Sequence, residues 1–166
     1  MKALAKKDWV TLANACCGFL AIMLAKSYGF WLPSGLIVLA VVFDWADGRI
    51  ARRTRSDEFG KQLDSLADAL SFGVAPAYVV LNVFAPFQPA ALAVLSLAAA
   101  VFYVCCALVR LACYNIRYGK KDYEGLPSPA AAIALLLLSW FDPSWLALWF
   151  FGLGALMVGK FTVRKP

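Results

Sequence analysis

The sequence predicts an all-α integral membrane protein with six transmembrane helices. Hydrophobic residues make up 63% of the chain and its mean hydropathy is +0.72, whereas soluble domains are about half apolar. The apolar residues gather into six segments whose lengths lie near the ~20 residues that a helix needs to cross a bilayer. The basic residues between these segments fall almost entirely on alternate connections. Together, these observations favour six membrane crossings.

The six segments follow one another closely, and no internal repeat is visible. In chain order, the expected spans cover residues 9–25, 31–49, 63–84, 90–112, 127–141 and 145–160. Gly73 and Pro76 fall inside the third span, where they permit a kink or a close approach between helices. We expect one domain over residues 1–166. Its short basic juxtamembrane segment, at about residues 1–8, is expected to stay in the protein and not to be cleaved as part of a signal peptide.

The sixteen Lys and Arg residues predict the orientation. With six spans, the basic stretches at residues 2–7, 49–61, 110–121 and 160–165 lie on one side, and only Lys26 lies on the other. The positive-inside rule makes the crowded side cytoplasmic, so both termini are expected there. The net charge of +6 then suits anionic lipid headgroups and pyrophosphates. Binding to nucleic acid is disfavoured because the basic residues are dispersed among the ends of the spans.

Four aspartates stand where a very apolar chain should least favour them. Asp44 and Asp47 are three residues apart at the end of the second span, and Asp64 and Asp68 are four apart at the start of the third. At about 100° per residue, each spacing brings both side chains to nearly one face of a helix. Either pair alone is typical of a solvated helix face. Two neighbouring helices could aim all four carboxylates at one point.

Carboxylates that converge at a membrane edge repel one another unless cations lie between them. The chain has no His, and oxygen ligands favour Mg²⁺ or Mn²⁺, with Ca²⁺ a possible occupant, over zinc or iron. The absence of His also excludes an imidazole base. The five cysteines show no metal-ligand spacing and are expected to pack as small hydrophobic residues.

The residues around these aspartates form a longer pattern, D-x-x-D-G-x-x-A-R followed by G-x-x-x-D-x-x-x-D. The chain resembles the CDP-alcohol phosphotransferase family in this signature, which is carried by Asp44, Asp47, Gly48, Ala51, Arg52, Gly60, Asp64 and Asp68. The family usually has eight residues between the Arg and the second Gly, whereas this chain has seven. The phosphate-contacting hydroxyl of that loop therefore belongs to either Thr54 or Ser56.

Three further strings are similar to the phosphatidylserine synthase branch of this family, which includes archaetidylserine synthases. They are LDSLAD with SFGVAP at residues 63–76, RLACYNIR at 110–117 and GLPSPAAA at 125–132. In the second string, Cys113 replaces an Arg that is usual in the branch. The resemblance runs from Thr11 to about Ala132, so hydropathy alone supports the last span.

The resemblance implies a cytoplasm-facing active site that joins L-serine to a CDP-lipid and releases CMP. Two divalent cations would be held by Asp44, Asp47, Asp64 and Asp68, with Asp68 also the catalytic base. Contacts to the CDP-lipid would come from Thr11, Asn14, Gly48, Ala51, Arg52, Ser56 and Gly60. The acceptor would be bound by Ser65, Arg110 and Asn115. The lipid would be CDP-diacylglycerol or CDP-archaeol, and the family implies a homodimer surrounded by membrane lipids.

Two alternatives remain open from the residues themselves. Within the family, the acceptor could be glycerol phosphate, inositol phosphate or another alcohol, because Arg110, Arg117 and Lys120 could serve a phosphorylated acceptor. From a different class, four carboxylates could line the path of a small metal or ion carrier. A carrier would be expected to place charges near midspan and often to show a repeated half. The sequence shows neither feature.

Overall fold

The fold is described by a computed structural model that covers residues 6–51, 58–116 and 125–159. In these residues all regular structure is helical, which confirms the all-α prediction. The α-helices are α1 (Lys6–Tyr28), α2 (Trp31–Ala51), α3 (Glu58–Asp68), α4 (Ala75–Phe84), α5 (Ala90–Ile116), α6 (Ser128–Phe141) and α7 (Leu146–Val158). A π-helical segment, η1 (Ala69–Val74), joins α3 to α4, and two short 3₁₀ turns, η2 (Ala85–Phe87) and η3 (Pro143–Trp145), follow α4 and α6.

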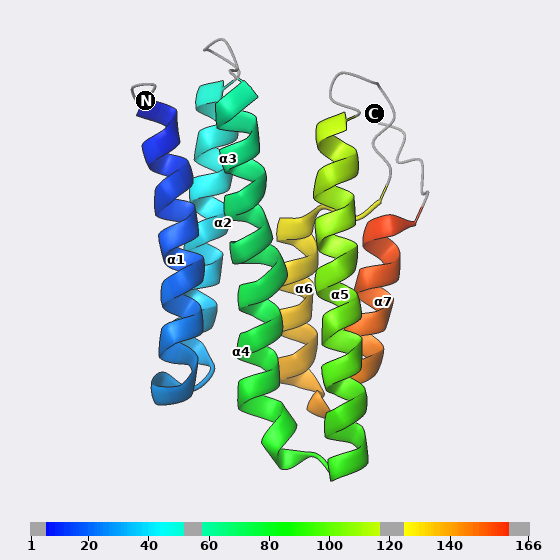
Figure 1. The fold of residues 1–166 in the computed structure, drawn as a ribbon. Coiled ribbons are helices and arrows are strands. Elements are labelled where there is room, and N and C mark those ends of the chain that lie inside the picture. Colours follow the sequence, from blue (N-terminus) through cyan, green and yellow to red (C-terminus); the bar gives the residue numbers. More distant parts are fainter. Residues whose placement is uncertain (1–5, 52–57, 117–124, 160–166) are drawn as a thin grey trace.

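The described helices make six antiparallel passes, because α3, η1 and α4 form one continuous rod (Figure 1). Four passes are long and apolar enough to cross a membrane: Asp8–Tyr28, Trp31–Arg49, Glu58–Phe87 and Ala90–Ile116. The helices at Ser128–Phe141 and Pro143–Val158 are apolar but shorter. The observed passes agree with the predicted segments except at their ends. The third, for example, begins at Glu58 rather than at residue 63.

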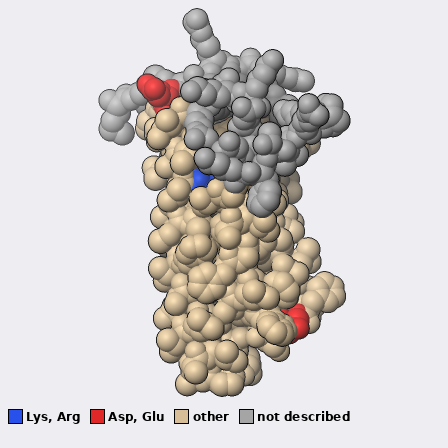
Figure 2. Space-filling model, turned by 90° about the vertical axis from the view of Figure 1, so that its right-hand side faces the viewer, with Lys and Arg blue, Asp and Glu red and all other residues tan. Residues whose placement is uncertain are grey.

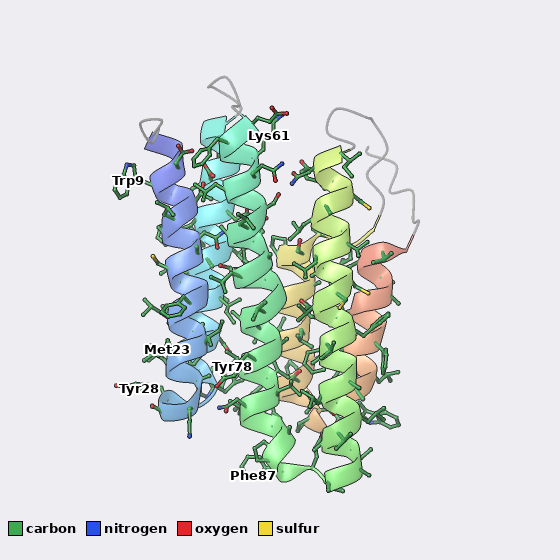
Figure 3. The ribbon with its side chains drawn as sticks, in the orientation of Figure 1. Trp9, Met23, Tyr28, Lys61, Tyr78 and Phe87 are labelled. Atoms are coloured by element: carbon green, nitrogen blue, oxygen red, sulfur yellow. The ribbon has the colours of Figure 1, made fainter. Side chains whose placement is uncertain are left out.

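The exterior of the bundle is largely apolar. Trp9 and Tyr28 are 63% and 62% exposed, and Figure 3 shows them near opposite ends of α1, pointing away from the other helices. On the face shown in Figure 2, charged side chains of the described residues appear only toward the two ends, with a broad uncharged band between. This distribution is typical of a protein that contacts lipid around its middle.

The helix directions bring the ends that border the motif to one end of the bundle. There α2 carries Arg49 in its last turn, α3 carries Lys61 near its start at Glu58, and α5 carries Arg110 less than two turns before its end at Ile116 (Figures 1 and 3). Lys26 lies near the opposite end, in the last turn of α1. The described basic residues of the second and third spans therefore gather at the same end as the four aspartates.

Small residues allow the helices to approach closely. A Cβ at Gly154 of α7 would lie 3.3 Å from Tyr103 Cα of α5, and a Cβ at Gly18 of α1 would lie 2.7 Å from Ser71 Cα of η1. Buried alanines fill much of the core between the helices. Close packing of this kind replaces the hydrophobic driving force that is missing between helices in lipid.

Gly125, just before α6, is the most constrained of these glycines. Its φ of +92° disfavours any side chain, and an added Cβ would lie 2.3 Å from Met157 O at the end of α7. The next residue, Leu126, donates its backbone N–H to Leu156 O at 3.0 Å. This contact ties the entry of α6 to α7.

We therefore expect Gly125→Ala to destabilise the protein by at least about 1–3 kcal/mol, the usual cost of such a backbone conformation for residues other than glycine. The measurement is the midpoint of thermal unfolding in detergent. Gly152→Ala is the matched control, because a Cβ at this position of α7 would meet nothing within 4 Å. Equal midpoints for the two variants would contradict the strain described for Gly125.

Candidate active site

Two helices of the same bundle end carry the four aspartates. Asp44 and Asp47 lie in the last two turns of α2, and Asp64 and Asp68 lie on α3. Asp44, Asp64 and Asp68 each offer a carboxylate oxygen, and these oxygens all lie within 4.8 Å of one another. Two unit charges about 5 Å apart repel by about 3 kcal/mol at an effective dielectric constant of about 20. This group could therefore hold a metal ion that offsets the repulsion.

Asp47 lies outside this group of three and is buried against α1. Thr11 donates its hydroxyl to Asp47 Oδ2 at 2.5 Å. The other oxygen, Oδ1, is buried and has no hydrogen-bond partner among the described residues. A buried carboxylate oxygen without a donor is costly unless a cation meets it, so Asp47 also fits the chemistry of a cation site.

The second polar residue of α1, Asn14, contacts α3. Its Nδ2 atom donates to Asp68 Oδ1 at 3.1 Å, and its Oδ1 atom is buried without a partner among the described residues. Asn14 is 1% exposed and Asp68 is 8% exposed. The polar pair of the first helix thus reaches one aspartate on each of the two helices that carry the motif.

The motif residues between α2 and α3 are described only in part. Gly48 is exposed, and a Cβ there would meet nothing within 4 Å. Gly60 is buried in the first turn of α3. Arg52 and the two candidate hydroxyls, Thr54 and Ser56, lie outside the described residues, as does the side chain of Ala51.

The candidate acceptor residues lie on α3 and α5. Asn115 donates its Nδ2 to Ser65 Oγ at 2.8 Å, which joins α5 to the residue that follows Asp64. Arg110 is 8% exposed and donates Nη1 to Ser128 Oγ at 2.7 Å. The positive charge of Arg110 also acts on Asp68 and opposes the repulsion that Asp68 experiences from Asp44 and Asp64. The structure thus brings a cation and a hydroxyl–amide pair to the side of α3 that faces α5.

Sequence reasoning did not single out Ser128, Ser71 or Tyr103. Ser128 lies in a string that resembles one branch of the family, but its contact with Arg110 depends on how α6 packs against α5. Ser71 and Tyr103 make buried hydrogen bonds to main-chain carbonyl groups next to the site. A polar residue inside an apolar run is the one signal that could have drawn attention to each of them.

Comparison with known proteins identifies the family. The family model described as CDP-alcohol phosphatidyltransferase matches residues 7–161. The chain is 39% identical over 136 residues to a CDP-diacylglycerol–serine O-phosphatidyltransferase of Methanocaldococcus jannaschii, covering 81% of this chain and 60% of the relative. It is 35% identical over 136 residues to an archaetidylserine synthase of Methanothermobacter thermautotrophicus, covering 80% and 56%.

A third relative is matched over most of both chains. It is a CDP-diacylglycerol–serine O-phosphatidyltransferase of Bacillus subtilis, 34% identical over 157 residues, which cover 91% of this chain and 85% of the relative. The chain spans a little over half the length of the two archaeal relatives. The match over residues 7–161 includes every described residue of the aspartate group, and on this evidence the chain belongs to the CDP-alcohol phosphatidyltransferase family.

Proposed function

We propose that this protein transfers a phosphatidyl or archaetidyl group from a CDP-activated lipid to the hydroxyl of L-serine and releases CMP. The observation that carries the proposal is the group formed by Asp44, Asp64 and Asp68, whose oxygens lie within 4.8 Å of one another at one end of an apolar bundle. Two relatives are named as serine O-phosphatidyltransferases, which favours serine as the acceptor.

The residues present fit two divalent cations, which we propose to be Mg²⁺ or Mn²⁺. All the candidate ligands are carboxylate oxygens, and the buried Oδ1 of Asp47 lacks a donor among the described residues. Asp44, Asp47, Asp64 and Asp68 would hold the ions, although Ca²⁺ could also occupy such a site. When bound, the cations would neutralise charge on the pyrophosphate and on the departing CMP.

The protein residues would divide the remaining work. Asp68 would accept the proton of the serine hydroxyl as that oxygen forms a bond to the phosphorus on the lipid side of the pyrophosphate. The bond from this phosphorus to the bridging oxygen breaks, and CMP leaves with that oxygen. The nucleotide phosphates would be contacted by the remaining motif residues, because hydrogen-bond donors such as the Arg52 guanidinium bind the negatively charged phosphate oxygens strongly. These residues are Gly48, Ala51, Arg52 and Gly60, with Ser56 from the loop.

Arg110 is our candidate for the carboxylate of serine. Its guanidinium is buried and oriented by Ser128, and a planar guanidinium matches a carboxylate in two parallel hydrogen bonds. Ser65 and Asn115 already bond to each other at 2.8 Å. We propose that this pair bounds the acceptor pocket on the side of α3 that faces α5.

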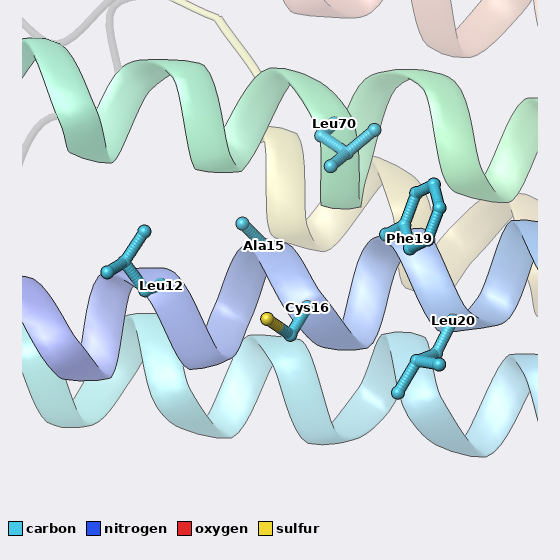
Figure 4. Close-up of a pocket in the computed structure, with 6 residues that line it drawn as sticks. All are labelled: Leu12, Ala15, Cys16, Phe19, Leu20 and Leu70. Carbon is cyan, nitrogen blue, oxygen red and sulfur yellow. The ribbon is translucent and has the colours of Figure 1, made fainter.

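An apolar groove beside the site suits the lipid part of the substrate. It measures about 400 Å³ and is lined by Leu12, Ala15, Cys16, Phe19, Leu20 and Leu70 (Figure 4). Asn14, which contacts Asp68, lies on α1 between Leu12 and Ala15. We propose that an acyl or isoprenoid chain leaves the site along this groove, so that only the headgroup reaches the carboxylates.

The same proposal extends to the setting of the enzyme. We propose a single membrane domain over residues 1–166 with both termini on the cytoplasmic side, because the described basic residues near the motif gather at the end that carries the aspartates. A homodimer is the assembly that the family resemblance implies. Cross-linking in native membranes measures the assembly independently of activity.

The test is CMP release from CDP-diacylglycerol and from CDP-archaeol by the purified protein in Mn²⁺ or Mg²⁺. Serine is expected to stimulate release with at least one lipid, and a chelator is expected to abolish it, because the carboxylates alone cannot neutralise the pyrophosphate. If CMP release were faster with glycerol 3-phosphate or inositol phosphate than with serine, the acceptor would be a phosphorylated alcohol and not serine. Metal flux in proteoliposomes without nucleotide, together with no CMP release, would favour the carrier.

A further inference from the structure

The helix that carries Asp64 and Asp68 changes its winding directly after Asp68. The following six residues, Ala69–Val74, form the π-helical segment η1, and Ala75 donates its backbone N–H to Leu70 O, five residues earlier. Such wide turns are rare and occur frequently at functional sites. One extra residue in the turn rotates the chain beyond it by about 100°. The face of α3 that carries Asp64 and Asp68 is therefore turned by about this angle from where an uninterrupted α-helix would place it relative to the core face of α4.

The sequence provides a reason for the wide turn. Pro76 has no N–H, so it cannot donate to the carbonyl four residues earlier, which belongs to Phe72, and its ring crowds that carbonyl. Tyr103 of α5 donates its hydroxyl to Phe72 O at 3.0 Å. Both side chains are fully buried. A neighbouring helix thus supplies a donor that proline cannot supply, as membrane helices require.

A second contact ties η1 to α1. Ser71 donates its hydroxyl to the main-chain oxygen of Asn14 at 2.9 Å. Gly18, one turn further along α1, permits this approach, because a Cβ there would lie 2.4 Å from Ser71 Oγ. The wide turn is therefore fixed to α5 through Phe72 and to α1 through Ser71.

The contacts that Ser71 and Tyr103 make with their neighbours both affect the position of the Asp68 carboxylate. Asp68 is the residue immediately before η1, and Asn14, whose main chain receives the Ser71 hydroxyl, donates its side-chain amide to Asp68 Oδ1 at 3.1 Å. The orientation of Asp68 thus depends on its connection to η1 and on the position of Asn14. A shift of η1 would disturb both.

We propose that Ser71 and Tyr103 are positioning residues that hold Asp68 in line with Asp44 and Asp64. Neither side chain belongs to the aspartate group, and each acts through the wide turn. The inference rests on the proposed function for its kinetic readout, whereas its metal-binding readout does not depend on turnover. The same residues would affect Asp68 whichever alcohol is the acceptor.

The experiment compares Ser71→Ala and Tyr103→Phe with Ser96→Ala. Each of the first two removes one hydroxyl from a contact with η1 and leaves the rest of the side chain in place. Ser96 is the matched control, because it is a buried serine of α5 whose hydroxyl donates to Gln88 Oε1 at 2.9 Å, away from the aspartates. Thermal unfolding midpoints report the stability lost by each variant.

At saturating Mn²⁺, we expect Ser71→Ala and Tyr103→Phe each to lower kcat about 10-fold and to leave the KM for the CDP-lipid nearly unchanged. The dissociation constant for Mn²⁺ alone, measured by electron paramagnetic resonance of the free ion, is expected to rise about 10-fold. Ser96→Ala is expected to change neither kcat nor the dissociation constant for Mn²⁺, even if it lowers the unfolding midpoint as much as Ser71→Ala and Tyr103→Phe do.

A double substitution makes the test specific to Asp68. In an Asp68→Asn background, Ser71→Ala is expected to weaken Mn²⁺ binding no further, because the residue through which it acts is already altered. Additive losses would overturn the proposal. Unchanged kcat and Mn²⁺ affinity in both single variants, with lowered midpoints like that of Ser96→Ala, would also overturn it.

The proposed function and the positioning role can fail separately. If the unsubstituted protein binds Mn²⁺ but releases no CMP with any acceptor, the proposed function fails, and the Mn²⁺ affinities of the variants still decide the positioning role. If the unsubstituted protein binds no Mn²⁺, the positioning proposal is overturned. If Ser71→Ala does not fold, Tyr103→Phe makes the same comparison from a different helix.

Discussion

Replacing Asp68 with asparagine is expected to lower CMP release about 10³-fold, within the range that a general base contributes. Asparagine has nearly the same shape but cannot take the proton of the serine hydroxyl. Its amide oxygen can still accept the hydrogen bond that Asn14 donates to Asp68 Oδ1, so the local packing should persist. The measurement is kcat together with equilibrium binding of the CDP-lipid.

The distinction between catalysis and binding identifies the role of Asp68. At saturating Mn²⁺, lipid binding should be largely retained, because Asp44, Asp47 and Asp64 keep their charges. The affinity for Mn²⁺ alone should fall at least as much as in Ser71→Ala. Glu58→Gln, an exposed change on the same helix, is the control and should behave like the unsubstituted protein. Loss of lipid binding in proportion to kcat would contradict the assignment of Asp68 as the base.

Asp44→Asn is expected to weaken Mn²⁺ binding by more than about 100-fold, the upper range found for groups that merely support a metal ligand. It removes one of three carboxylates whose oxygens lie within 4.8 Å of one another. In chelator, the same change should raise the unfolding midpoint, because it removes like-charge repulsion. Without metal, Asp44→Asn should therefore be more stable than the unsubstituted protein. With Mn²⁺, it should gain less stability than the unsubstituted protein does.

Thermal unfolding with and without Mn²⁺ measures both effects. Mn²⁺ at about 100 times its dissociation constant should stabilise the unsubstituted protein by about 2.7 kcal/mol and Asp44→Asn by far less. Asp142→Asn is the control, since Asp142 lies between α6 and α7 and its Oδ1 accepts the Ser144 backbone N–H. Equal stabilisation of Asp44→Asn and the unsubstituted protein would exclude Asp44 as a ligand.

The fold was largely predictable because the hydropathy and charge patterns that determine membrane helices can be read directly from the order of the residues. Apolar segments of near-spanning length predicted the helices, and the alternation of basic connections predicted which ends lie together. The spacings of Asp44 with Asp47 and of Asp64 with Asp68 predicted shared helix faces. Consecutive antiparallel helices commonly pack side by side. Those spacings were therefore enough to predict that the carboxylates of the two helices could lie close together.

The contacts inside the site were not predictable in the same way. The sequence did not indicate that Thr11 would donate to Asp47, or that Asp47 would lie outside the group formed by the other three. These contacts depend on how each helix is rotated, and helices that are apolar on every face carry little information about rotation. Pro76 predicted a kink or a close approach, but not the donor that Tyr103 supplies from α5.

The most direct measurement is anomalous scattering at the manganese absorption edge from crystals of the protein grown with Mn²⁺. The account predicts two peaks about 3.5–4 Å apart, between the ends of α2 and α3, bounded by oxygens of Asp44, Asp47, Asp64 and Asp68. Peaks elsewhere in the bundle would contradict it. So would a structure in saturating Mn²⁺ with no peak near these oxygens.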